Sequence, residues 1–256
     1  MFYVSLTSIY QNQSRLYQTL NDVVHTQTLL PEKIFIQLSE EPYLRDIGFK
    51  NKQITDINLL QLLEKYNNLI ELRWVKNIGP YRKLIYTISD NWESEIPIIT
   101  IDDDHLFDNN LFKNLYNDYL ENNMCANYRG FTMASENLKQ FDYEAKASLK
   151  QRYLYNFSTN GGGTIFNSKF FKNTNNLLLD DTVFLQLANT ADDIWYNFIR
   201  IINDSLLFVS HDKKWMKRDN SNHANGLYFN YNKKSNNIIA KKIIDYLLEF
   251  KYYKDV

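Results

Sequence analysis

The stretch Ile96-Pro97-Ile98-Ile99-Thr100-Ile101-Asp102-Asp103-Asp104 decides the fold that this sequence predicts. Its first part is apolar at nearly every position, whereas a strand with one solvated face would alternate apolar and polar residues. Burial on both faces is typical of a strand in the centre of a parallel sheet. Three consecutive acids follow this strand at its carboxyl end, which is the edge where open α/β sheets bind ligands.

Short apolar runs alternate with helical patterns on the amino-terminal side of this strand. We expect strands at 2–6, 33–38 and 69–74, with helices around 16–24, over 56–66 and from 79 to about 89. This repetition with short connections predicts an α/β fold, a Rossmann-like sandwich in which helices flank a mainly parallel central sheet. The second half is less regular, with helices predicted over 111–120, 191–202 and 238–250, and a short strand over 206–209.

The composition favours one compact domain. The 256 residues include 4 Pro and 7 Gly, and no Pro/Gly/Ser-rich linker divides them. With 29 basic and 30 acidic side chains there is no long-range field to gather nucleic acid, so we expect no nucleic-acid partner. The single Cys125 is predicted to be a buried thiol. Neither a signal peptide nor an apolar stretch of membrane-spanning length is recognisable, so we expect a cytoplasmic protein.

The acid run is a candidate metal site. Residues two apart on an extended segment point the same way, so Asp102 and Asp104 can face one ligand. Two carboxylates held so close repel each other unless a cation or strong donors lie between them, and oxygen ligands of this kind suit Mg²⁺ or Mn²⁺. The alternative is that these acids cap a helix that begins near Asp108. Capping needs fewer acids than three, so we favour the metal site.

The acid run also resembles a known family. Residues 98–104 look like the D-x-D segment of glycosyltransferases with the nucleotide-diphospho-sugar transferase fold, often called GT-A. Further segments resemble bacterial and viral glycosyltransferases of surface-polysaccharide assembly, including chloroviral rhamnosyltransferase domains. Those segments are Val4-Ser5-Leu6-Thr7-Ser8, residues 27–34, Gly79-Pro80-Tyr81-Arg82-Lys83-Leu84-Ile85, Asn160-Gly161-Gly162-Gly163 and Thr190-Ala191-Asp192-Asp193-Ile194-Trp195. Together they cover about residues 2 to 205.

The resemblance implies a single glycosyltransferase domain over 1–256. Residues 1–105 would form the nucleotide-sugar binding half, 106–210 the acceptor and catalytic half, and 211–256 a carboxyl-terminal extension. The enzyme would use Mn²⁺ or Mg²⁺ to transfer a hexosyl or deoxyhexosyl group to a hydroxyl of a glycan or lipid-linked glycan. The donor would be a UDP- or dTDP-linked sugar. The donor sugar, the linkage, the anomeric outcome and the oligomeric state are not predicted.

The resemblance also assigns site residues. Leu6, Thr7 and Ser8 would lie beside the nucleoside, although they could equally be an ordinary strand end. The metal would be bound by Asp104, Asp102 and His211, because enzymes of this fold often add a late histidine ligand. The donor would further contact Asp102, Asp103, Lys83, Arg129 and the loop Gly161-Gly162-Gly163. A cation such as Lys83 would offset charge on the leaving diphosphate.

The helix start at Thr190 has two interpretations. Thr190 as N-cap with Asp193 three residues later approximates a capping box. In the resembled family an acid at an equivalent helix start deprotonates the acceptor hydroxyl, which makes Asp193, or else Asp192, the predicted catalytic base.

Two other functions remain open. One is a nucleotidyltransferase that makes sugar nucleotides, although no Gly-rich basic loop follows the first strand. The other is a non-catalytic glycan-binding or assembly protein on the same fold. The basic residues around Trp215, from Lys213 to Arg218, are interpreted as a solvated loop. The apolar face of the terminal helix is predicted either to pack on the domain or a second subunit, or to make peripheral membrane contact.

Overall fold

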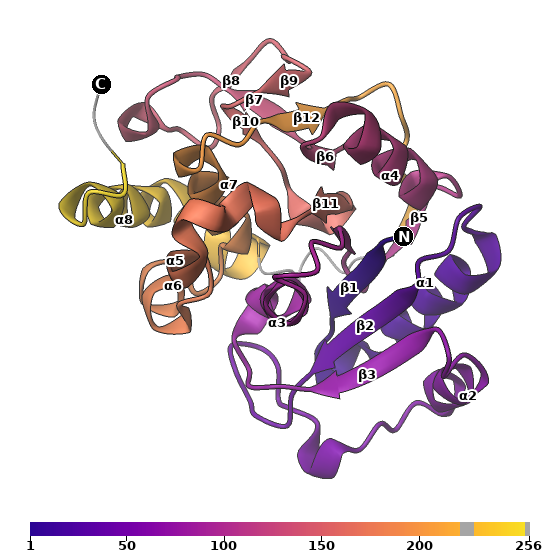
Figure 1. The fold of residues 1–256 in the computed structure, drawn as a ribbon. Helices are drawn as coiled ribbons and strands as arrows, with labels where there is room; N and C mark the ends of the chain where they lie inside the picture. The colour runs from indigo at the N-terminus through magenta and orange to yellow at the C-terminus, as the bar shows by residue number, and fades with distance from the viewer. Residues whose placement is uncertain (221–227, 254–256) are drawn as a thin grey trace.

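The computed structural model of the protein describes residues 1–220 and 228–253, and Figure 1 shows its fold. The main sheet has eight strands in the order β3-β2-β1-β4-β11-β6-β12-β9. In that order their bounds are Ile70–Trp74, Lys33–Leu38, Tyr3–Thr7, Ile98–Thr100, Thr164–Phe166, Cys125–Asn127, Leu207–Val209 and Arg152–Tyr153. Strands β1, β2, β3 and β4 pair in parallel, as do β6 and β12, whereas β11 and β9 are antiparallel to their neighbours. The predicted α/β class with a mainly parallel sheet is confirmed.

Strand β4 occupies the central position that its apolar run predicted. It lies between β1 and β11, and all three of its residues are buried. Ile98 belongs to the hydrophobic core on one face of the sheet and Ile99 to the core on the other, as the alternation of side chains along a strand requires. Burial on both faces explains why this strand has no polar/apolar alternation.

Helices cover both faces of the sheet (Figure 1). One core is closed by α1 (Gln13–Thr26), α2 (Ile57–Lys65) and α4 (Leu111–Asn122), and it includes Leu16, Leu59 and Phe112. The other is closed by α3 (Ile85–Asp90), α5 (Asn175–Leu178), α6 (Asp181–Ala188), α7 (Asp192–Ile202) and α8 (Asn236–Glu249). The predicted helices over 16–24, 56–66, 111–120 and 191–202 are therefore present, with shifts of a few residues at their ends.

Two small sheets complete the second half. Strands β7 (Phe131–Met133), β8 (Lys146–Ala147) and β10 (Asn156–Phe157) form one of them. In the other, β13 (Met216–Asp219) pairs antiparallel with β5 (His105–Phe107), so that Asp219 lies opposite His105. This pairing returns a late segment of the chain to the acid run that follows β4.

The helix predicted from 79 to about 89 is divided in two. A 3₁₀ turn, η3 (Gly79–Lys83), is followed by the short helix α3, and Leu84 between them has φ −120° and ψ −48°, outside ordinary helical geometry. Helix α4 begins at Leu111, as the pattern over 111–120 predicted, and not near Asp108, where the capping alternative placed its start. The tighter 3₁₀ turn matters because it orients Arg82 and Lys83 inward, and both side chains are buried.

The terminal helix α8 packs on the protein itself. Its buried residues, such as Ile243 and Leu247, join the core formed with α6 and α7. A membrane contact through this helix would be left to exposed side chains such as Ile238 and Phe250. Within the described residues, none of the helices combines the length and the apolar character that crossing a bilayer requires. The predicted extension 211–256 includes 221–227 and 254–256, which lie outside the described residues.

Candidate active site

The acid run alternates in direction at the end of β4. Asp103 is buried, whereas Asp102 and Asp104 are partly exposed. Three potential ligand atoms lie within 4.8 Å of one another: one carboxylate oxygen of Asp102, one of Asp104 and one ring nitrogen of His105. Asp102 and Asp104 are thus close enough to face one ligand, and His105 lies with them. Their role as ligands stays a prediction.

The side chains of this cluster fit a divalent cation. Asp104 Oδ1 and His105 Nδ1 are paired at 2.8 Å, and neither of these buried atoms has any other polar partner. Buried polar atoms normally have partners, so these two could both be satisfied by one ion. His105 was not predicted, and the only signal for it was its place directly after the acids.

His211, the predicted third ligand, is engaged elsewhere. Its Nε2 lies 2.7 Å from the carbonyl oxygen of Gly130. A carbonyl oxygen only accepts, so Nε2 carries the proton and donates. Among the described residues, the group that could hold a metal ion does not include His211. Its role as a ligand stays a prediction without support from this geometry.

Lys83 joins the acid cluster to the second predicted acid pair. Its Nζ lies 2.7 Å from Asp102 Oδ1 and 3.5 Å from Asp192 Oδ2, and its side chain is only 7% exposed. Burial alone would lower the pKa of Lys83, but the charges of Asp102, Asp192 and Asp193 outweigh it and raise that pKa. Burial likewise favours a raised pKa for Asp102, yet the neighbouring Lys83 lowers it. Both groups are therefore charged at neutral pH.

The predicted capping box at the start of α7 is wrong. The N-cap residue is Ala191, which has no side chain that could cap the helix. Thr190 Oγ1 instead donates a hydrogen bond of 2.6 Å to Asn232 Oδ1. Asp193 is thus free of helix capping, and its Oδ1 accepts a hydrogen bond of 2.9 Å from the backbone N–H of Asn160. Burial, and then the adjacent charge of Asp192, raise the pKa of Asp193 to about 7. A carboxyl group of that pKa can accept a proton near neutral pH.

The glycine loop closes tightly on Asp102. A Cβ atom on Gly161 would lie 2.1 Å from Asp102 Oδ2, so only glycine leaves room for the carboxylate in this position. Gly163 has φ +92°, which also favours glycine. The same loop, through Asn160, holds Asp193. The loop therefore lies between the two acid pairs.

The residues predicted to lie beside the nucleoside make their side-chain contacts within the protein. Leu6 is fully buried in the core, and Thr7 Oγ1 donates to the carbonyl oxygen of Gln37 at 2.7 Å. Ser8 Oγ donates to Asp103 Oδ2, which also accepts from Asn12 Nδ2 at 3.3 Å. Asp103 thus anchors the loop after β1 and faces away from the metal-ligand group. Because the side chains of Thr7 and Ser8 are engaged within the protein, a ligand at the end of β1 would contact the backbone of this loop.

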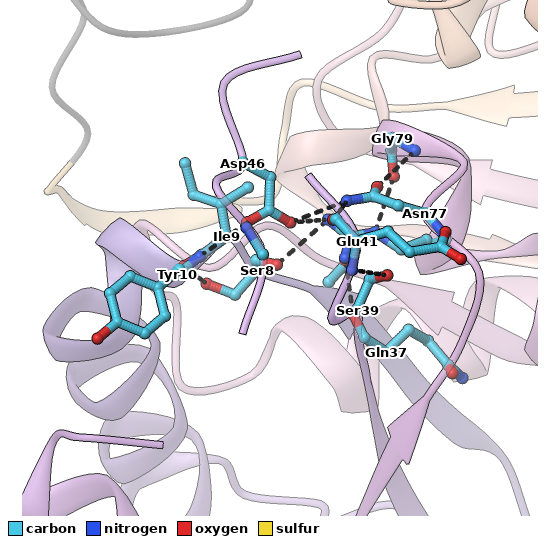
Figure 2. A network of polar contacts seen from close by, with 12 residues as sticks. Ser8, Ile9, Tyr10, Gln37, Ser39, Glu41, Asp46, Asn77 and Gly79 are labelled. Carbon is cyan, nitrogen blue, oxygen red and sulfur yellow. Dashed lines mark hydrogen bonds and ion pairs between the residues drawn. The ribbon is translucent and has the colours of Figure 1, made fainter. Parts of the chain in front are cut away.

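A buried network that the sequence analysis missed ties the neighbouring loops together (Figure 2). Asp46 Oδ1 accepts from the backbone N–H groups of Tyr10 and Gly48, both at 3.1 Å. Its Oδ2 accepts from Asn77 Nδ2 at 3.2 Å and from the Arg82 guanidinium at 3.0 Å. The loops after β1, β2 and β3 are joined through this one carboxylate. No short motif marks Asp46, because three of its partners, Tyr10, Asn77 and Arg82, come from other parts of the chain.

Arg129 lies against the glycine loop. Its Nη1 would be 3.2 Å from a Cβ on Gly161, and its guanidinium lies over the ring of Trp215 at 5.1 Å. It contributes to the lowered pKa of Asp102, after burial and Lys83. The structure thus brings Lys83, Arg129 and Gly161 close to the predicted acids Asp102, Asp104, Asp192 and Asp193. Leu6, Thr7, Asp103 and His211 are instead engaged in the core or by other residues.

Comparison with solved structures identifies the fold. No family model matches the chain, and no curated protein matches it in sequence. The structure is similar to that of S. aureus TarS, a GT-A-type glycosyltransferase, in complex with UDP-GlcNAc. The two chains are 14% identical, with a TM-score of 0.54, and the match covers 96% of this chain and 67% of the TarS chain. The TarS complex with UDP is similar at 15% identity and TM-score 0.50, over 83% and 58% of the two chains.

A second kind of enzyme has the same core. The 4-diphosphocytidyl-2C-methyl-D-erythritol synthase of Anaerococcus prevotii DSM 20548 is similar at 14% identity and TM-score 0.51, over 96% of each chain. This chain covers 58% of TarS 1-349 with UDP, 59% of TarS 1-349 alone and 36% of a longer TarS chain. Identities this low show the fold alone. The chain has a GT-A-type fold.

Proposed function

We propose that the protein is a metal-dependent glycosyltransferase that moves a sugar from a nucleoside diphosphate to a hydroxyl group of a glycan, in polysaccharide or glycan assembly. The observation that carries the proposal is the position of Lys83 between Asp102 and Asp192. Through it, the acids that would hold a cation on the diphosphate are joined to Asp192, the neighbour of the proposed base Asp193, at one edge of a GT-A-type sheet. The TarS structures were solved with UDP and UDP-GlcNAc, so a UDP-linked donor is the first to test.

The cation site would be Asp102, Asp104 and His105. A divalent cation there would neutralise charge on the donor diphosphate. Lys83, held in place by its two carboxylates, would donate to the departing phosphate oxygens. The loop after β1, fixed by Asp103, would face the nucleoside with its backbone. The glycine loop would let the donor sugar approach the chain closely.

Asp193 would serve as the catalytic base. The acceptor oxygen attacks the anomeric carbon, its proton passes to the Asp193 carboxylate, and the bond from that carbon to the diphosphate breaks with its electron pair leaving on the phosphate oxygen. The hydrogen bond from Asn160 fixes the orientation of the carboxylate. This arrangement inverts the anomeric configuration.

A nucleotidyltransferase is the second candidate, favoured by the likeness to the diphosphocytidyl-methylerythritol synthase over 96% of each chain. Such enzymes typically have a Gly-rich basic loop after the first strand to hold a triphosphate. Here the segment from Ser8 to Gln13 has neither glycine nor lysine nor arginine. We therefore place glycosyl transfer first.

The two reactions release different products, which gives the test. Purified protein is incubated with Mn²⁺ and a UDP-sugar, and separately with UTP and a sugar 1-phosphate. A glycosyltransferase releases UDP from the first mixture, slowly to water and faster with an acceptor, and a chelator stops it. A nucleotidyltransferase releases pyrophosphate from the second, and a binding protein releases neither.

The matched variants are Asp104→Ala and Asp245→Ala. The first removes a proposed cation ligand and should abolish UDP release while the fold is kept, as monitored by circular dichroism. The second removes an exposed carboxylate on α8 and should leave the rate unchanged. Normal turnover in Asp104→Ala would reject the cation site.

A further inference from the structure

An open cleft of about 540 Å³ lies beside the proposed active site. Arg129, His211, Lys213, Lys214 and Trp215 are among the residues that line it, and no acidic side chain does so within the described part of the chain. The chain as a whole has a formal charge of −1, so this local excess of cations is not a general property of its surface.

The cleft shares walls with the active site. The ring of Trp215 lies 5.3 Å from the ring of His105, a proposed cation ligand, and the Arg129 guanidinium covers it at 5.1 Å. A Cβ on Gly162 would be 2.9 Å from Arg129 Cβ and 3.1 Å from Trp215 Cε3. A ligand in the cleft would therefore be next to the glycine loop, where the donor sugar is expected.

The charges in the cleft are not all compensated. Lys213 is paired with the buried Asp118, at 2.8 and 3.0 Å to its two oxygens. Arg129 and Lys214 form no ion pair with any residue that the structure describes, although Arg129 is held by its aromatic contact. Two cations remain for a ligand. A guanidinium is well matched to phosphate or carboxylate oxygens, and an indole ring presents an apolar surface to a sugar.

We propose that this cleft binds the acceptor, and that the acceptor is a glycan with a negative charge, a phosphodiester or a carboxylate, near the sugar that is glycosylated. The proposal rests on the glycosyltransferase function proposed above and adds the chemical class of the acceptor. Trp215 would pack on the acceptor sugar, while Arg129 and Lys214 would pair with the anionic group.

Binding is tested first without donor, so that the result does not depend on catalysis. Isothermal titration uses a glycerol-phosphate oligomer, a galacturonate oligomer and neutral maltohexaose as probes. At least one anionic oligomer should bind, with a Kd that rises with salt. Reversing one charge in Lys214→Glu should weaken that binding about tenfold, roughly the effect of 1.4 kcal/mol. Lys242→Glu, which changes an exposed lysine on α8, should not weaken it.

The phosphate and carboxylate probes distinguish the two sources of charge, and binding of either supports the proposal. Three results would overturn it: anionic probes that bind no better than maltohexaose, equal losses in Lys214→Glu and Lys242→Glu, or an oligouridylate bound at Lys214 as tightly as the best glycan. In the last case the cleft would recognise charge alone.

A kinetic arm then links the cleft to transfer. With saturating donor, Lys214→Gln should raise the KM for the anionic acceptor about three- to fivefold, as expected for one exposed charge pair, with kcat unchanged. Donor hydrolysis without acceptor should be unaffected, since Lys214 is not part of the proposed donor site. A wild-type protein that binds the anionic glycan but releases no nucleoside diphosphate from any UDP- or dTDP-linked sugar would refute the proposed transferase activity and leave the anion-binding cleft standing.

Discussion

Lys83 Nζ lies 2.7 Å from Asp102 Oδ1, and through this contact η3 is joined to the end of the central strand. The same ammonium group is 3.5 Å from Asp192 at the start of α7. One buried cation thus keeps two acid pairs, 90 positions apart in the sequence, in a single site. Without it their carboxylates would repel each other in a region of low dielectric.

Replacement of Lys83 by Gln should lower UDP release by about 10²- to 10³-fold, the usual effect of removing one preorganised donor that faces developing charge. Mn²⁺ affinity should be retained or increased, because a competing cation has been taken from Asp102. Rates and a Mn²⁺ titration of the same preparation measure the two effects. Lys83→Arg keeps the charge and should recover part of the rate. If rate and Mn²⁺ affinity fall together in Lys83→Gln, the lysine only holds the acids in place.

Gly161→Ala should disable the cation site without a large loss of fold. The new methyl group would be 2.1 Å from Asp102 Oδ2, so that carboxylate must move. We expect loss of the Mn²⁺-induced rise in Tm and of UDP release, with a destabilisation of about 1–3 kcal/mol from overpacking.

Gly163→Ala is the matched control in the same loop. Its φ of +92° disfavours alanine, so it should also be destabilised, but no atom of Asp102 is among the three closest that its Cβ would meet. The Mn²⁺-induced shift should therefore survive there. Loss of the shift in both variants would mean that the loop as a whole, and not room for Asp102, matters.

The pH dependence of transfer should report Asp193. Its pKa is raised to about 7 by burial and by Asp192, so kcat/KM should fall as the pH drops below that value and the base becomes protonated. Asp193→Asn should lower the rate by about 10²- to 10⁴-fold and should lack this acid limb. An unchanged pH profile in the variant would assign the base to another group, with Asp192→Asn as the next test.

Asp193→Asn should also be more stable than the wild type at alkaline pH. A carboxyl group whose pKa is higher in the folded than in the unfolded chain weakens the fold as the pH rises from about 4 through the folded value. The Asn side chain has no such titration and can still accept the hydrogen bond from Asn160. The Tm of Asp193→Asn should thus exceed that of the wild type near pH 8 and approach it near pH 4. A lower Tm near pH 8 would contradict the raised pKa.

Asp46 should be important for stability. Its ion pair with Arg82 has both side chains only 2% exposed, and removing one partner of such a pair typically costs about 3–5 kcal/mol. Urea unfolding of Asp46→Ala measures this. Asp245→Ala, which breaks an exposed pair with Lys241, should cost less than about 0.5 kcal/mol. Similar losses in the two variants would show that the buried network contributes little.

The sequence by itself determined the four parallel strands and the first two long helices of the first hundred residues, and the position of the acids. Continuous apolar character of residues 96–101 was enough to predict burial on both faces, because only an internal strand can bury every side chain. The periodic patterns of α1, α2, α4 and α7 predicted those helices, since each must cover one core with one stripe of apolar residues. Local patterns carry this information because the repeat of a strand or helix is itself local.

The tertiary structure decided which of these residues meet. His105 joins the acids after β4, while His211 is held by Gly130. Asp193 accepts a hydrogen bond from the glycine loop instead of capping its own helix, and Asp46 has three partners from distant segments. The physical reason is that hydrogen bonds, ion pairs and burial depend on distances in space between residues remote in sequence. Those distances follow from the order of the strands, which no local pattern contains.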